Sequence, residues 1–496
     1  MKRKKGRSGW LNIGGLVAVL GAAAGCAMSG MGGSDFGATQ GGVQDLALAR
    51  EYVAAGTVPP PEAFPVEGIF SEHDLPLQGT PCQTLLCLRT ALGLAPTAAG
   101  ESAAWLQVGM SSTIDPETWE RPAQTLIFTV DVSGSMGWDY KEVGEYPSPG
   151  ALSRLLMKEI VSRLDANDRV AIVTYGSTSR LRLSPTEATS GAVTREIDAL
   201  SSGGSTNMEA GLERAIAVAR DLQGASNVRI MLFTDVRPNV GATEASEFEG
   251  LVAEAAALGA GTTVFGLGAG LGPETFEAMS HLRGGNAFAL FDQEDLTDLM
   301  EESWPWMLTP IAYDLELSLG ASQGFQVTEA YGFPAPEVGA ATAPQLNAAS
   351  VFLSRKRGAM LVQLQPLTSA ATHVLTGLEI AGQLRYETPE GHRVEQPVLQ
   401  RVTGEEPRDA AGHYFEQASV GKTVALALLC EGMQEATRQY AADPAAAIAV
   451  LQAALDRYRA DIEVYEDASL QAEVEFASAL LTLLEEGAPQ TDLYGR

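Results

Sequence analysis

The clearest pattern along the chain is an alternation of short apolar runs with segments of helical period between Gln124 and Glu302. The apolar runs are rich in β-branched residues and have the length of strands buried on both faces. They cover residues 126–130, 170–175, 230–234 and 262–267. Between them, apolar residues recur at helical spacing over 152–160 and 212–219. This alternation predicts an α/β fold, a doubly wound and mostly parallel sheet with helices on both faces.

The pattern changes after Trp304, where apolar and polar residues begin to alternate with a period of two. Such stretches cover 313–319, 360–365 and 383–387, and Gly and Pro turns separate them. They predict a β-sandwich-like unit. Residues 414–486 are rich in Ala, Leu and Glu with helical period, which predicts a C-terminal helical region of two or three antiparallel helices.

The N-terminus has the pattern of an export signal. A basic head at residues 1–7 precedes the apolar run 10–24, which is short for a membrane-spanning helix. Ala23-Ala24-Gly25-Cys26 resembles the bacterial lipobox, although Ala23 stands where Leu is usual. The resemblance implies a lipid on Cys26 and a location in the cell envelope, at the outer membrane if the source has one. Ordinary secretion with cleavage near Gly25 is the alternative.

The chain has 496 residues, which is longer than a chain that folds around a single hydrophobic core. Its length and these patterns together predict several segments. We expect a signal peptide over 1–25, a flexible tether over 26–50, an accessory region over 51–120, the α/β domain over 121–303, the β-sandwich-like domain over 304–402 and the helical region over 403–496.

The charge balance limits the partners. With 33 Lys and Arg against 62 Asp and Glu, the formal net charge is −29. Binding to nucleic acid draws its affinity from clustered Lys and Arg, and no such cluster follows the N-terminus. We therefore expect no nucleic-acid partner, and contact with a membrane only through the lipid anchor. An acidic partner would need a positive centre at the contact.

Three cysteines remain besides Cys26. Export makes a disulfide between Cys82 and Cys87 plausible, but a helix running on from Cys82 would hold the two Cα atoms too far apart. Cys430 lies in an apolar run, which predicts a buried thiol. No CxxC pair and no His-rich cluster argues for zinc.

Oxygen donors gather directly after the predicted strands. Asp131, Ser133 and Ser135 follow the first strand, with Gly134 expected to permit a tight turn. Thr206 lies in a Gly-rich loop before a predicted helix, and Asp235 closes another strand. Loops at the carboxyl ends of parallel strands meet at one edge of the sheet. Hard oxygen donors brought together there suit Mg²⁺ or Mn²⁺.

This constellation resembles the metal ion-dependent adhesion site of von Willebrand factor type A domains, over roughly Gln124 to Glu302. The resemblance implies that Ser133, Ser135 and Thr206 are hydroxyl ligands and that Asp131 and Asp235 are acidic ligands, partly through water. It also implies that the metal binds an Asp or Glu of a protein partner. One departure is Val236, because Gly commonly follows the second Asp.

Each of these residues also has an ordinary explanation. Ser135 and Thr206 precede helices and could be N-caps. Asp131 and Asp235 end strands and could simply accept hydrogen bonds from backbone amides. Only the combination of all five residues, in order, favours a metal site.

Two other functions compete with metal-dependent binding. A phosphohydrolase could use Asp131 as its nucleophile, but Ser133 is a poor proton donor and no His is paired with a nucleophile, so we expect no enzyme. An envelope scaffold could instead bind partners through its sandwich and helices, with a purely structural metal. Gly421-Lys422-Thr423 is not a phosphate loop, because Glu416 stands where the first Gly belongs, and Lys422 is expected to be a solvated helix residue.

Overall fold

The structure is a computed structural model. It describes residues 36–80, 84–115, 117–138, 148–222, 227–236, 238–270, 272–322, 324–333, 345–367 and 375–491. The predicted signal peptide and Cys26 lie outside these residues.

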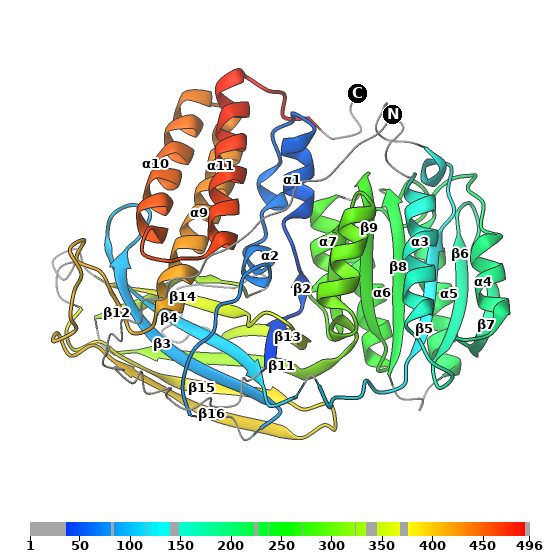
Figure 1. Ribbon diagram of the computed structural model, residues 1–496, viewed down its shortest axis with the longest axis horizontal. Helices are drawn as coiled ribbons and strands as arrows, with labels where there is room; N and C mark the ends of the chain where they lie inside the picture. Colours follow the sequence, from blue (N-terminus) through cyan, green and yellow to red (C-terminus); the bar gives the residue numbers. More distant parts are fainter. Residues whose placement is uncertain are drawn as a thin grey trace, which may run out of the picture. The chain divides into compact units, whose positions relative to one another are not determined.

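Seven strands form the sheet of the α/β domain (Figure 1). They are β2 (Gly42–Val43), β5 (Thr125–Asp131), β6 (Arg169–Tyr175), β7 (Arg180–Glu187), β8 (Val228–Val236), β9 (Gly261–Gly270) and β10 (Gly285–Leu290). The order is β2-β10-β9-β8-β5-β6-β7, and only β7 at the edge pairs antiparallel. The prediction of a mostly parallel sheet is confirmed.

Helices cover both faces of this sheet (Figure 1). They are α3 (Pro149–Ser162), α4 (Gly191–Asp198), α5 (Met208–Asp221), α6 (Ala245–Ala257), α7 (Pro273–Ser280) and α8 (Gln293–Asp298). Because successive strand residues point to opposite faces, Ile127 packs with α5, α6 and α7, while Leu126 and Phe128 pack with α3, α4 and α8. The domain therefore has two apolar cores, one on each side of the sheet.

A second sheet has ten strands and is antiparallel throughout its described pairings. Its strands are β1 (Phe36–Gln40), β3 (Leu86–Pro96), β4 (Ser102–Ser112), β11 (Pro310–Ala321), β12 (Phe325–Tyr331), β13 (Gln345–Ser354), β14 (Ala359–Pro366), β15 (Glu379–Glu387), β16 (Arg393–Arg401) and β17 (Tyr414–Phe415). The period-two stretches are strands, as predicted. The boundaries 304–402 were wrong, however, because β4 pairs with β14 and β17 pairs with β3.

Apart from β2, the α/β domain is thus an insertion between β4 and β11 of one continuous sheet. The predicted accessory region over 51–120 is not separate, since β3 and β4 belong to this sheet. Nor are residues 36–50 a flexible tether. β1 pairs with β13 and β4, and β2 pairs with β10 of the other sheet. Two residues of β2 were too short a signal for sequence reasoning to find.

Three long helices form the C-terminal region, as predicted. They are α9 (Ala418–Tyr440), α10 (Pro444–Ile462) and α11 (Ala468–Glu486). Two shorter N-terminal helices, α1 (Ala47–Ala54) and α2 (Val66–Ser71), share the apolar core of this region with one face of β3 and β4. Single turns complete the described helices: η1 (Pro61–Ala63), η2 (Ser135–Gly137), η3 (Leu299–Ser303) and η4 (Trp306–Leu308).

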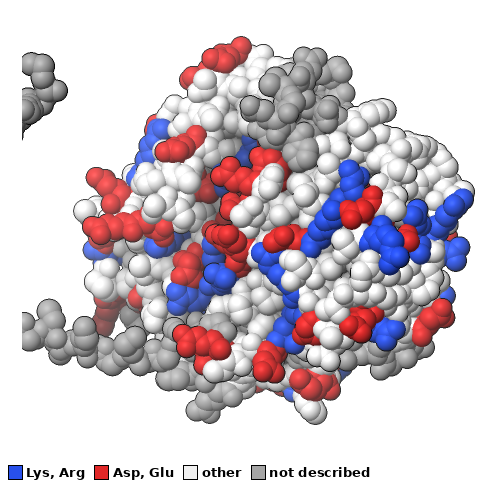
Figure 2. Space-filling model, turned by 45° about the vertical axis from the view of Figure 1, so that its right-hand side comes forward, with Lys and Arg blue, Asp and Glu red and all other residues white. Residues whose placement is uncertain are grey.

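Acidic and basic side chains are interspersed on the face shown in Figure 2, so the negative net charge is not gathered there into a field of one sign. Within the described parts of the chain, no helix combines the length and apolar character needed to cross a membrane.

Candidate metal centre

The first loop of the site follows β5. Asp131 ends this strand at 2% exposure, and its Oδ1 accepts a hydrogen bond from the Ser133 backbone N–H at 2.7 Å. Its Oδ2 lies 3.4 Å from the Thr234 hydroxyl. The chain then enters η2, where the Ser133 and Ser135 hydroxyl oxygens are 3.1 Å apart. A carboxylate and two hydroxyls are therefore gathered within one turn.

The second loop carries Thr206 and is held against the first by backbone hydrogen bonds. The Gly134 N–H donates to Gly204 O at 3.0 Å, and the Gly203 N–H donates to Val132 O at 2.7 Å. Gly204 has φ +95°, and a Cβ there would lie 2.7 Å from Ser177 Oγ, so a side chain cannot be accommodated. Thr206 is 1% exposed beneath this contact.

The third loop follows β8 and brings Asp235 to the same place. The register between β8 and β9 shifts between Thr234 and Val236, so Asp235 lies at an irregularity of the kind that redirects a side chain. The Ser135 hydroxyl donates to Asp235 Oδ1 at 3.3 Å. Further along the loop, Asn239 Oδ1 accepts from the Thr206 N–H at 3.0 Å. All three loops are thus joined.

The two carboxylates are buried without a cationic partner in these contacts. Burial raises the pKa of Asp131 to about 6, against the effect of its hydrogen bonds from Ser133. Burial and the charge of Asp131 raise the pKa of Asp235 to about 8. Asp235 Oδ2 is buried and has no hydrogen-bond partner among the described residues. A buried acceptor left unsatisfied costs free energy, and a cation would satisfy it.

The hydrogen bonds of these residues bear on the alternative that they only cap helices or accept from backbone amides. Asn207, not Thr206, caps α5, because its side chain accepts from the Ala210 N–H. Ser135 makes no capping hydrogen bond either; its hydroxyl faces Asp235. Asp131 accepts from the backbone amide of Ser133, as that explanation expects, and Asp235 accepts both from its own backbone N–H and from the Ser135 hydroxyl of another loop.

One expectation about this loop was wrong. Gly134 has φ −62° and ψ −39°, a conformation open to any residue, so the turn does not need a glycine for its backbone angles. The conformational requirement lies at Gly204 on the neighbouring loop.

Sequence reasoning missed the residues that frame the site. Asn239 connects two loops, and no local pattern distinguishes it from any other loop Asn. Trp138 follows η2 and is 66% exposed, and Val240, beside Asn239, is 41% exposed. Tryptophan is enriched among the residues that carry most of the binding energy in protein interfaces.

The two described cysteines, Cys87 and Cys430, lie on β3 and α9 and not on the three loops of the site. Cys87 is disulfide-bonded and belongs to β3, so the helix that would have argued against a bond is not present there. Cys82 lies outside the described residues, and its pairing with Cys87 stays a prediction. Cys430 is a buried free thiol, as expected, and burial raises its pKa far above the ordinary value.

Comparison with known proteins concerns the domain that carries these loops. Residues 126–237 match the von Willebrand factor type A domain family. The chain is 34% identical over 230 residues to the uncharacterized protein YfbK of Escherichia coli K12, a match covering 45% of this chain and 38% of YfbK. The chain thus spans well under two thirds of the length of that relative.

A solved structure extends the likeness beyond the matched segment. The von Willebrand factor type A protein from Catenulispora acidiphila superposes with a TM-score of 0.50 and 14% identity, covering 82% of this chain and 91% of that one. At this identity the likeness concerns the fold alone. The fold and the sequence match together define a protein that contains a von Willebrand factor type A domain.

Proposed function

We propose that the type A domain binds one Mg²⁺ or Mn²⁺ and uses it to bind an acidic residue of a protein partner. Domains of this class point to protein–protein interaction or adhesion. The observation that carries the proposal is the pair of buried carboxylates, Asp131 and Asp235, which meet hydroxyls but no cationic side chain among the described residues. Asp235 Oδ2 in particular lacks any described partner.

The donor set fits a hard cation. Ser133, Ser135 and Thr206 would supply neutral hydroxyl oxygens, and Asp131 and Asp235 would supply negative charge, partly through water. Mg²⁺ prefers six oxygen ligands and keeps water where the protein supplies fewer. A bound cation in this site would therefore supply an electrophilic centre with a position left for an outside donor.

The best outside donor is a carboxylate. Ligation mainly by hydroxyls leaves much of the positive charge of the metal uncompensated, so an Asp or Glu of a partner is attracted to it. The chain otherwise repels acidic surfaces, since its formal net charge is −29. Trp138 and Val240 would add apolar contact area beside the metal.

The location belongs to the same proposal. The basic head, the apolar run and Cys26 support export and a lipid anchor in the cell envelope. A protein held there could retain a partner at the membrane surface without itself crossing the membrane. Neither catalysis nor nucleic-acid binding is part of this function.

A pull-down from an envelope extract tests the proposal. Capture should be lost on chelation, return with Mg²⁺ or Mn²⁺, and fail in Ser133→Ala and Thr206→Ala, because each loses a ligand oxygen. Ser205→Ala is the matched control, since Ser205 lies beside Thr206 on the same loop, its hydroxyl lies 3.0 Å from that of Ser177, and it is not a proposed ligand.

Folding of each variant is checked by circular dichroism. Capture that persists in chelator, with the protein folded, would contradict the proposal. It would favour the scaffold function, in which the ten-stranded sheet and the C-terminal helices carry the binding surface.

A further inference from the structure

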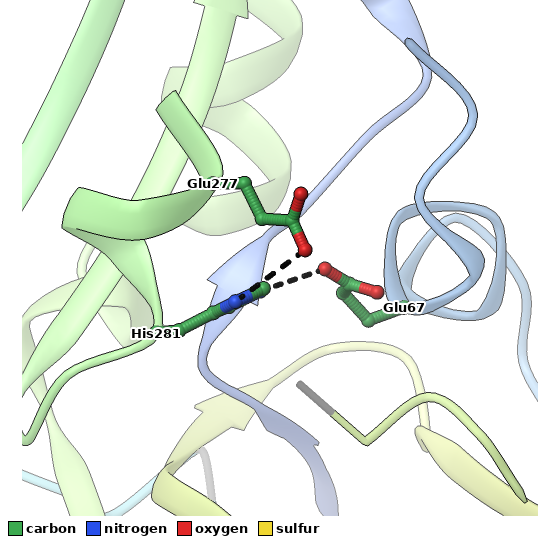
Figure 3. Close-up of side chains that lie close together, drawn as sticks. All are labelled: Glu67, Glu277 and His281. Carbon is green, nitrogen blue, oxygen red and sulfur yellow. Dashed lines mark hydrogen bonds and ion pairs between the residues drawn. The ribbon is translucent and has the colours of Figure 1, made fainter. Parts of the chain in front are cut away.

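A second group of metal-ligating side chains lies outside the adhesion-type site. Glu67 on α2, Glu277 on α7 and His281 at the end of α7 point toward one another (Figure 3). His281 Nε2 is 2.8 Å from Glu67 Oε1, and Nδ1 is 3.7 Å from Glu277 Oε1. One ligand atom from each residue lies within 4.8 Å of the other two.

The imidazole is held in place from a third side. β2 passes directly beside it, and a Cβ on Gly42 would lie 2.9 Å from His281 Nε2. Gly42 has φ +107°, which side chains rarely allow. The backbone therefore approaches the ring more closely than any other residue at position 42 would permit. Glu67 and His281 are both largely buried, at 8% and 12% side-chain exposure.

The surroundings carry an excess of negative charge. Burial raises the pKa of Glu277, and beside it lie three carboxylates, those of Glu67, Glu274 and Glu62, which also raise this pKa, against the single imidazole of His281, which lowers it. Glu277 and His281 also line a cavity of about 580 Å³, together with the acidic side chains of Glu249 and Glu274. A divalent cation at the three ligands would offset this excess and would face the cavity.

We infer that Glu67, Glu277 and His281 form a second metal site, selective for a divalent transition metal such as Zn²⁺. Imidazole nitrogen is a ligand that Zn²⁺ favours, whereas Mg²⁺ favours oxygen, so the two sites of this chain select different metals. Three protein ligands leave a fourth position for water from the cavity. The bound metal links α2, which precedes the type A domain in sequence, to α7 within it.

Calorimetric titration of the purified full chain with Zn²⁺, in excess Mg²⁺, tests this inference. We expect one equivalent of Zn²⁺ to bind and to raise the melting temperature. Glu277→Gln should weaken the binding at least about tenfold, since even residues that merely support metal ligands cost that much when changed. Its side chain is 39% exposed, so the substitution should not disturb folding.

Two controls separate this site from other sources of binding. Glu274→Gln lies on the same helix and beside the same cavity, and it should bind Zn²⁺ as the wild type does. Asp131→Ala should also leave Zn²⁺ binding unchanged, which keeps this result independent of the adhesion-type site.

Co²⁺ gives a second readout, because imidazole and carboxylate ligation at low coordination number produces visible absorption bands that His281→Gln should abolish. The inference is overturned if the folded wild type binds no Zn²⁺, or if Glu277→Gln binds it as tightly. Equal losses of Zn²⁺ affinity in Glu277→Gln and Glu274→Gln would also overturn it. They would indicate that Zn²⁺ binds to the acidic surface in general and that His281 forms only a metal-free ion pair.

Discussion

At the scale of single residues, burial would make protons compete with the proposed metal ion for the same oxygens. Burial raises the pKa of Asp131 and of Asp235, and the charge of Asp131 raises the pKa of Asp235 further. A carboxyl group must lose its proton before it can bind a cation. Metal binding should therefore release protons.

We predict that affinity for Mg²⁺ or Mn²⁺ rises between pH 6 and pH 8, the range set by pKa values of about 6 for Asp131 and about 8 for Asp235. The direction of this pH dependence follows from the linkage between proton binding and folding. A carboxyl with a raised pKa binds more protons when folded, so the metal-free protein loses stability as pH rises through these values, and the metal restores it. Calorimetry in buffers of different ionisation enthalpy measures the released protons.

Asp131→Ala should abolish this binding, because the site keeps mainly neutral oxygens. Asp221→Ala, at the end of α5 and away from the three loops, serves as the control. Equal binding by the wild type and Asp131→Ala, or an affinity that does not change with pH, would exclude the site.

Elements whose pattern is local were predictable. Strands such as β5 and β8 are continuous apolar runs, and the order of Asp131, Thr206 and Asp235 along the chain was enough to suggest their convergence. β1 and β2 were not predictable, because they are short and their partners lie hundreds of residues away. The same holds for Glu67 and His281, which only the packing of α2 against α7 brings together.

An ion pair joins two helices of the C-terminal region. Lys422 on α9 is not solvated as expected; its Nζ lies 2.6 Å from Asp467 Oδ2 at the start of α11. Partial burial would raise the pKa of Asp467, but the hydrogen bonds from Lys422 and Ser469 hold it at about 2. The ion pair therefore stabilises the fold at pH values above 3.8, the ordinary pKa of an Asp, and this stabilisation is lost as the pH falls toward 2.

Asp467→Asn should therefore lower the free energy of unfolding by about 1 kcal/mol at neutral pH, a figure that allows for solvent screening of a partly exposed pair. Asn retains the capping hydrogen bond to the Ser469 N–H, so the change isolates the charge. Urea unfolding at pH 7 and pH 3 should show the difference shrinking at the lower pH. If the wild type and Asp467→Asn differ in free energy of unfolding by the same amount at both pH values, the ion pair contributes nothing to stability.

At the scale of the whole molecule, the proposed anchor and the proposed binding site belong to different parts of the chain. If Cys26 carries a lipid, Cys26→Ser should leave the protein in the soluble fraction or unprocessed. Several acyl chains on one residue hold a protein firmly where a single chain does not. Fractionation followed by mass spectrometry of the N-terminus measures this. A processed Cys26→Ser protein that stays with the membrane would show that the lipid is not the anchor.

The insertion of the type A domain into the ten-stranded sheet has a consequence for synthesis. β1 and β4 leave the ribosome long before β13 and β14, their partners, while the inserted domain carries nearly all of its own strands between them. Contacts between distant segments form late because closing long loops is costly. A nascent chain therefore completes its binding domain first, and it waits with the edges of β1 and β4 uncovered. Such edges are where aggregation begins, so any chaperone that attends this protein has most to protect before residue 366 is made.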